Sequence, residues 1–184
     1  MRHLPNLICI FRLGLVWPVA AALAQGRFLL ALGLFMLAAV SDGIDGFLAK
    51  RFNWTSELGK FLDPMADKLL LMTVFIEAAW LGLVPWWTTA AAVARDVMIG
   101  LGALIFRVWF GPLRGRPAVI SKVNTAAQLL YLAAVMLGAA SGFPPHEVLD
   151  ALALVTFVTI VLSGYHYMAT FTRRAWSASA QPSS

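Results

Sequence analysis

The chain has 184 residues, of which 60% are hydrophobic and only 12% are charged. Soluble domains carry about 25% charged residues, so this composition excludes an ordinary soluble domain. The net charge is +5, but the chain has no soluble basic surface, which argues against nucleic-acid binding. The positive charge instead indicates attraction to anionic lipid headgroups.

Six apolar stretches follow one another along the chain, and each is close to the roughly 20 residues that cross a bilayer as a helix. They lie near residues 7–24, 28–48, 61–82, 86–109, 119–140 and 148–170. The connections are short, and only a polar tail at 177–184 is left over. The sequence therefore predicts an all-α integral membrane protein, a single domain over 1–184 with six transmembrane helices.

The basic residues predict the orientation of these helices. If both termini are cytoplasmic, only Arg27 faces outward, while Arg12, Lys68 and Arg95 fall within spans. The remaining basic residues are then cytoplasmic: Arg2, Lys50, Arg51, Lys60, Arg107, Arg114, Arg116, Lys122, Arg173 and Arg174. This is the positive-inside bias of membrane proteins.

The first span resembles a signal peptide, with an apolar run and a cleavage-like Ala22-Leu23-Ala24. Arg12 interrupts the apolar run, and we expect this helix to be retained. Within a span, an arginine either snorkels or packs as a structural residue, or it meets an anion in a functional site.

Two pairs of aspartates flank the connection between the second and third spans, Asp42 with Asp45 and Asp63 with Asp67. Residues three or four positions apart share one face of a helix, so each pair offers two carboxylates to a common space. Carboxylates within a membrane domain are costly and mark functional sites. Such an arrangement of oxygen ligands predicts a site for hard divalent cations.

The residues between the pairs add detail to this site. A merely solvated turn would explain the polar residues of the loop, but not acidic pairs on both flanks. Gly46 and Gly59 allow a ligand to approach the backbone closely. Pro64 disfavours the helical conformation at Asp63, so Asp63 is expected either to cap or to kink the third helix.

This region resembles the signature of the CDP-alcohol phosphatidyltransferase family. The matching run reads Asp42-x2-Asp45-Gly46-x2-Ala49-Lys50-x8-Gly59-x3-Asp63-x3-Asp67. The family usually has Arg where this chain has Lys50, so the charge is kept but a bidentate phosphate fork would be lost.

The resemblance implies a role for each matched residue. Two divalent metal ions, Mg²⁺ or Mn²⁺, would be bound by four carboxylates: Asp42, Asp45, Asp63 and Asp67. Asp67 would also act as the general base. CDP-diacylglycerol would be held by Gly46, Ala49 and Gly59 around the cytidine and by Lys50 near the diphosphate. Arg12 would join this substrate site, because the spacing Asn6-x5-Arg12 is also common near the start of family members.

The fourth and fifth spans carry the candidate acceptor site. Arg95 and Asp96 point about 100° apart on a helix, so they need not pair with each other, and Arg95 is expected to meet an acceptor phosphate. Arg116 and Lys122 are the other acceptor-binding candidates. They precede a polar stripe at helical spacing, which is either interhelical contact or the wall of an acceptor pocket. Its members are Ser121, Asn124, Thr125 and Gln128.

The resemblance implies transfer of a phosphatidyl group from CDP-diacylglycerol to an alcohol, with release of CMP, in phospholipid biosynthesis. Three segments resemble the eukaryotic-type cardiolipin synthase branch, whose acceptor is phosphatidylglycerol: 95–98, 121–125 and 163–167. The runner-up is the phosphatidylglycerophosphate synthase branch, which uses glycerol 3-phosphate. We expect a bacterial inner-membrane protein, a homodimer, with its active site facing the cytoplasm.

Two other classes share single features with the chain. An intramembrane prenyltransferase also uses aspartates and Mg²⁺ with a diphosphate, but normally has more helices and lacks the spacing of Gly46 and Gly59. A cation transporter could place acidic pairs within the membrane, but does not require the Ala49-Lys50 element. Release of CMP would separate both from a phosphatidyltransferase.

Overall fold

The structure, a computed structural model, describes residues 4–52, 57–110 and 119–179. Side chains are described for residues 10–41, 43, 67–105, 119–170 and 172. These parts of the chain form six helices, listed here with their bounds: α1 Leu4–Ala24, α2 Phe28–Phe52, α3 Glu57–Trp80, α4 Trp86–Phe110, α5 Val119–Ser141 and α6 His146–Ser179. The all-helical prediction is confirmed for the described residues, and each expected span coincides with one helix.

Glycine ends two of these helices where the sequence must turn. Gly26 and Gly82 have φ values of 68° and 72°, a region that residues with a side chain rarely adopt. At Gly26 the N–H donates to Leu23 O, and the next N–H donates to Ala22 O, which closes the end of α1 in a Schellman motif. Gly82 ends α3 with the same pair of bonds. Both turns therefore stay short, and the helices run back and forth.

The start of α3 corrects one expectation. Asp63 was expected either to cap or to kink the third helix, but α3 begins at Glu57, so Asp63 lies inside the helix and does not cap it. Residues that precede a proline are biased against the helical conformation without being barred from it. Capping was therefore the wrong alternative.

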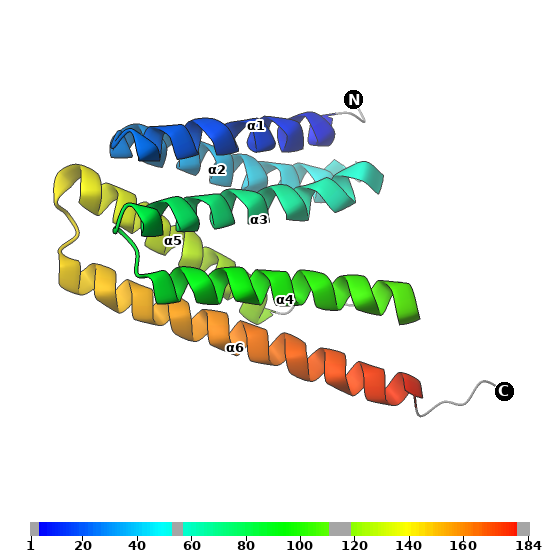
Figure 1. The fold of residues 1–184 in the computed structure, drawn as a ribbon. Coiled ribbons are helices and arrows are strands. Elements are labelled where there is room, and N and C mark those ends of the chain that lie inside the picture. Colours follow the sequence, from blue (N-terminus) through cyan, green and yellow to red (C-terminus); the bar gives the residue numbers. More distant parts are fainter. Residues whose placement is uncertain (1–3, 53–56, 111–118, 180–184) are drawn as a thin grey trace.

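The helices form an elongated bundle with two groups (Figure 1). Helix α1 packs against α2 and α3, α4 packs against α6, and α5 connects the groups through contacts with α2, α3 and α6. The N-terminal end of α1 and the C-terminal end of α6 lie toward the same end of the bundle, as an even number of crossings requires. The C-terminal end of α2 and the N-terminal end of α3 lie toward this end too.

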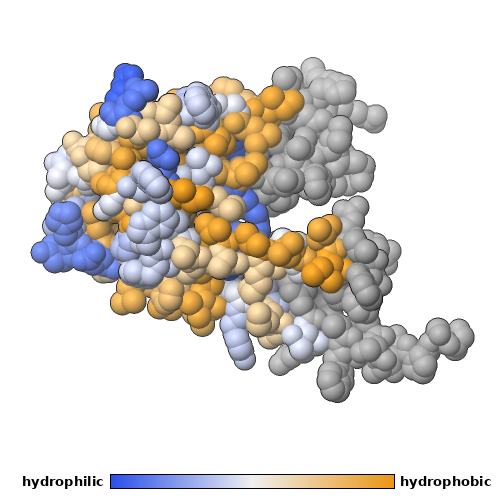
Figure 2. Space-filling view, viewed as in Figure 1, coloured by the Kyte–Doolittle hydropathy of each residue, from blue (hydrophilic) through white to orange (hydrophobic). Residues whose placement is uncertain are grey.

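Apolar side chains fill the interior and also cover the outside. Phe35, Phe75, Tyr131 and Leu132 are buried in one core, whereas the outer faces expose many large apolar residues, for example Leu104. In Figure 2 the hydrophilic residues gather mainly at the end where the α1–α2 and α5–α6 turns lie, and apolar residues cover much of the sides. An apolar exterior of this extent is typical of a surface that faces lipid.

Three described helical segments are long and apolar enough to cross a membrane: Trp86–Ile105, Val119–Ser141 and His146–Thr170. Two shorter apolar segments, Ile10–Ala24 and Phe28–Ser41, lie in α1 and α2. The tryptophans at the α3–α4 turn are exposed, with Trp80 at 77%, and the Trp80 and Trp86 rings meet edge to face at 6.3 Å between centroids. Exposed tryptophans at helix ends are typical of the interface between lipid and water.

Candidate active site

A cavity of about 390 Å³ lies between α3, α4, α5 and α6. Its walls are Asp67, Lys68, Leu71, Arg95, Asp96, Ile99, Ser121, Thr125, Gln128 and Tyr167. Most of these side chains are polar or charged, although the surrounding helices are apolar. Charged residues within such helices are costly unless they are paired or serve a site, which makes this cavity the candidate active site.

Asp67, the expected general base, lies at the edge of the cavity and pairs with Arg12. The Nη1 atom of Arg12 is 2.5 Å from Asp67 Oδ1, so α1 and α3 are joined by an ion pair. The Arg12 side chain is only 1% exposed, whereas that of Asp67 is 34% exposed. The carboxylate can therefore be reached from the cavity while the guanidinium supports it from within the bundle. Arg12 was expected to meet an anion, and the Asp67 carboxylate is such an anion.

Arg95 and Asp96 also pair, although neighbouring positions on a helix point about 100° apart and need not meet. Arg95 Nη1 lies 2.5 Å from Asp96 Oδ1, and both residues are buried. The Arg95 side chain is long enough to bring its guanidinium to the Asp96 carboxylate. This pairing avoids two unpaired charges in the interior, which would be costly. Lys68 of α3 lies 3.6 Å from the same carboxylate oxygen.

Two neighbouring helices, α5 and α6, also hold the Arg95 guanidinium in place. Its Nη2 atom donates to Ser121 Oγ of α5 at 3.0 Å and to Ser163 Oγ of α6 at 2.6 Å. The Tyr167 ring lies over the guanidinium carbon at 5.9 Å from its centroid, within the range of a cation–π contact. Arg95 is thus oriented by several partners and faces a cavity that it lines.

The polar stripe predicted on α5 does point into the bundle. Asn124 and Gln128 are buried, and Ser121 and Thr125 are partly buried. The two alternatives for the stripe both occur, because Asn124 accepts a hydrogen bond from Thr159 of α6, whereas Ser121, Thr125 and Gln128 line the cavity. The stripe therefore combines interhelical contact with the wall of a pocket.

Lys122, one of the three expected acceptor-binding residues, is exposed and is not among the residues that line this cavity. Arg116 lies outside the described residues. Of the predicted acceptor group, the structure places only Arg95 at the cavity.

The other predicted site residues have side chains outside the described part of the chain. These are Asp42, Asp45, Asp63, Gly46, Ala49, Lys50 and Gly59. Their backbone belongs to the last half of α2 and the first half of α3. Asp67 follows on α3 at the same end of the bundle.

Asp67 is the predicted metal ligand whose side chain the structure describes. It fits a magnesium or manganese ion, because a carboxylate is a hard oxygen donor and this one is accessible at the edge of the cavity. Among the described side chains, no group of three or more His, Cys, Asp or Glu residues could hold a metal ion.

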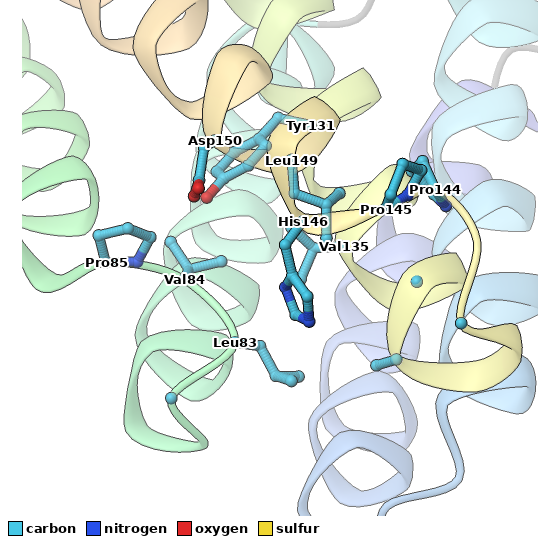
Figure 3. A pocket seen from close by; sticks show the side chains of 14 residues that line it. Leu83, Val84, Pro85, Tyr131, Val135, Pro144, Pro145, His146, Leu149 and Asp150 are labelled. Atoms are coloured by element: carbon cyan, nitrogen blue, oxygen red, sulfur yellow. The ribbon is translucent and has the colours of Figure 1, made fainter.

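A second pocket, of about 350 Å³, lies at the opposite end of the bundle and contains none of the predicted site residues (Figure 3). It is formed by the α3–α4 and α5–α6 turns together with α5 and α6. The Asp150 carboxylate points toward the Tyr131 hydroxyl, while the His146 ring projects toward Leu83. The predicted site residues and this pocket therefore lie at different ends of the bundle.

Sequence reasoning missed three residues of the candidate active site, namely Lys68, Ser163 and Tyr167. Lys68 adjoins Asp67 and was interpreted only as a charge within a span. Ser163 and Tyr167 belong to a segment that was used only to choose between branches of a family. The available signal was the spacing of Ser163 and Tyr167, two polar residues that lie four positions apart and therefore share one face of the last helix.

Comparisons with known proteins identify the family of this chain. The family model described as CDP-alcohol phosphatidyltransferase matches residues 2–172. A rat protein named cardiolipin synthase (CMP-forming) is 33% identical over 180 residues, which cover 89% of this chain and 60% of the rat protein. The human protein of the same name is 32% identical with the same coverage.

A second type of relative comes from Escherichia coli K12 and is named CDP-diacylglycerol--glycerol-3-phosphate 3-phosphatidyltransferase. It is 36% identical over 138 residues, which cover 71% of this chain and 68% of that protein. The chain spans about 60% of the length of its rat and human relatives. The family match extends over nearly all of the six helices, and the chain therefore belongs to the CDP-alcohol phosphatidyltransferase family.

Proposed function

We propose that this protein transfers a phosphatidyl group from CDP-diacylglycerol to the hydroxyl of phosphatidylglycerol and releases CMP. The observation that carries the proposal is that Asp67, the candidate base, and Arg95, the candidate acceptor-binding residue, line one cavity. A base and a phosphate-binding cation in a common space are what an acceptor with both a hydroxyl and a phosphate requires. The family match supports this over a prenyltransferase or a cation transporter.

On the donor side, four carboxylates would hold two Mg²⁺ or Mn²⁺ ions: Asp42, Asp45, Asp63 and Asp67. When bound, these ions neutralise the diphosphate and the charge that develops on the CMP leaving group. Gly46, Ala49, Lys50 and Gly59 would hold the cytidine diphosphate. Arg12 holds Asp67 in place from α1 and lies close enough to the site to contribute to donor binding.

On the acceptor side, Asp67 takes the proton from the attacking hydroxyl. The hydroxyl oxygen then forms a bond to the phosphatidyl phosphorus, and the bond from that phosphorus to the CMP oxygen breaks. Arg95 and Lys68 attract the acceptor phosphate, and Asp96 fixes the two cations at the wall of the cavity. Arg116 and Lys122 would guide the anionic acceptor toward the site from outside the cavity.

Phosphatidylglycerol is favoured because the relatives named cardiolipin synthase cover 89% of the chain, and because of one segment on α6. Ser163, which bonds Arg95, lies on that helix, in a segment that resembles the same branch. Glycerol 3-phosphate is the alternative acceptor, as in the name of the Escherichia coli relative. We further propose a homodimer with six spans in the bacterial inner membrane, with both termini and the active site on the cytoplasmic side.

The experiment offers the two acceptors separately. The purified protein is supplied with CDP-diacylglycerol, Mg²⁺ and either phosphatidylglycerol or glycerol 3-phosphate, and the lipid products and CMP are identified. Cardiolipin formed with phosphatidylglycerol, and little product with glycerol 3-phosphate, supports the proposal. Phosphatidylglycerophosphate as the main product would replace the proposed acceptor with the alternative.

A further inference from the structure

Gln128 of α5 is a buried amide whose nitrogen has no hydrogen-bond partner. The residue is 1% exposed, and its Nε2 atom is one of the few buried side-chain polar atoms without a partner among the described residues. A buried donor without a partner is destabilising, so native proteins rarely keep one unless a ligand or water completes the bond. Unlike Asn124, which lies one turn earlier and also has an unpartnered amide nitrogen, Gln128 lines the cavity.

The position of Gln128 in the cavity suggests what it donates to. It shares the wall with Arg95 and Lys68, both of which can donate hydrogen bonds, whereas the Thr125 hydroxyl already donates to Ser121 O. The Nε atom of Arg95 is a second buried donor without a partner. The two carboxylates of the cavity, Asp67 and Asp96, are each paired with an arginine. The buried donors that remain without a partner, Gln128 Nε2 and Arg95 Nε, therefore suit a ligand that offers oxygen acceptors.

We propose that Gln128 is a specificity-determining residue that donates its amide N–H to an oxygen of the acceptor alcohol. The inference rests on the proposed function and adds a contact to the acceptor side of that site. Arg95 supplies a positive charge, which attracts the phosphate of any acceptor. The neutral amide of Gln128 instead favours an acceptor that has an oxygen at the matching position. Gln128 thus distinguishes acceptors by shape rather than by charge.

The test uses two substitutions that remove an amide from the same face of α5. Gln128→Met keeps an unbranched side chain of similar length, and Asn124→Leu is its matched control outside the cavity. Both are compared with the parent protein in KM for phosphatidylglycerol, KM for CDP-diacylglycerol, kcat and melting temperature. The shift in melting temperature on adding phosphatidylglycerol without CDP-diacylglycerol reports acceptor binding independently of turnover.

For Gln128→Met we expect about a 10-fold higher KM for phosphatidylglycerol and a smaller acceptor-induced melting shift, with KM for CDP-diacylglycerol unchanged. Its melting temperature without acceptor should be equal or higher, because an unpartnered buried donor has been removed. Asn124→Leu should leave the KM for phosphatidylglycerol unchanged.

An unchanged acceptor KM and melting shift in Gln128→Met, or equal changes in the two variants, would overturn the inference. A parent protein that is stabilised by phosphatidylglycerol but transfers nothing would instead overturn the proposed function. In that case the acceptor-induced shift alone decides the role of Gln128.

Discussion

At the scale of single residues, the chemistry depends on charges that support each other across helices. Arg12 and Asp67 lie 55 positions apart, so their pairing could not be predicted from spacing along the chain. What could be predicted was that each needs a partner, because an isolated charge within apolar helices is costly. The sequence therefore indicated that Arg12 and Asp67 each need a partner, but it did not show that they pair with each other.

The Arg12–Asp67 pair can be tested by a double-mutant cycle with Arg12→Leu and Asp67→Asn. Arg12→Leu should lower the free energy of unfolding by about 1–3 kcal/mol, because it removes the guanidinium beside a partly buried carboxylate. The double variant should be more stable than Arg12→Leu alone, since the charge left by that substitution is gone.

Asp67→Asn should lower kcat by about 100-fold or more, because an amide cannot accept the proton of the attacking hydroxyl. Activity should remain lost in the double variant even where stability returns. Thermal unfolding and CMP release measure the two quantities, and near-normal turnover of Asp67→Asn would remove the general-base assignment.

At the scale of helices, the sequence predicted the elements better than their contacts. Apolar runs placed all six helices, because the length of an apolar run is a local property of the sequence. The pairing of Arg95 with Asp96 was not predicted, because side-chain length overrode the angle between neighbouring positions. The aspartate pairs expected from helical spacing stay a prediction, because the side chains of Asp42, Asp45 and Asp63 lie outside the described residues. Ser163 was missed because its partner Arg95 lies 68 positions away on another helix.

The contact between α4 and α6 leads to a second prediction, for Ser163→Ala. Ser163 is buried and does not line the cavity, so it acts on the site only by orienting Arg95. Removing its hydroxyl should raise KM for the acceptor several-fold, about what one hydrogen bond to a charged group is worth, with little change in KM for CDP-diacylglycerol.

Thr156→Val is the matched control, because it removes another buried hydroxyl of α6, one that donates to Ala127 O of α5. Ser163→Thr keeps the hydroxyl and should restore the acceptor KM if the side chain fits. Equal effects of Ser163→Ala and Thr156→Val on both KM values would show that Ser163 only stabilises the bundle.

At the scale of the whole molecule, the bundle separates two ends of different character. The cavity with Asp67 and Arg95 lies between four helices, whereas exposed tryptophans, Arg27 and the second pocket belong to the other end. Six crossings with cytoplasmic termini would place Lys122 and Arg27 on opposite faces of the membrane.

This topology predicts the outcome of cysteine labelling in intact cells. Arg27→Cys and Lys122→Cys are each introduced into a Cys9→Ser background, because Cys9 is the only cysteine of the chain. A membrane-impermeant maleimide should label Arg27→Cys in intact cells and Lys122→Cys only after permeabilisation. Labelling of both from outside would contradict the predicted orientation.

Metal-dependent release of CMP from CDP-diacylglycerol in the presence of phosphatidylglycerol is the most direct test of phosphatidyl transfer by this protein. We expect one CMP for each cardiolipin formed, loss of both after chelation of divalent metal, and recovery on adding Mg²⁺ or Mn²⁺. CMP release that continues unchanged after chelation, or no release with either phosphatidylglycerol or glycerol 3-phosphate, would contradict it.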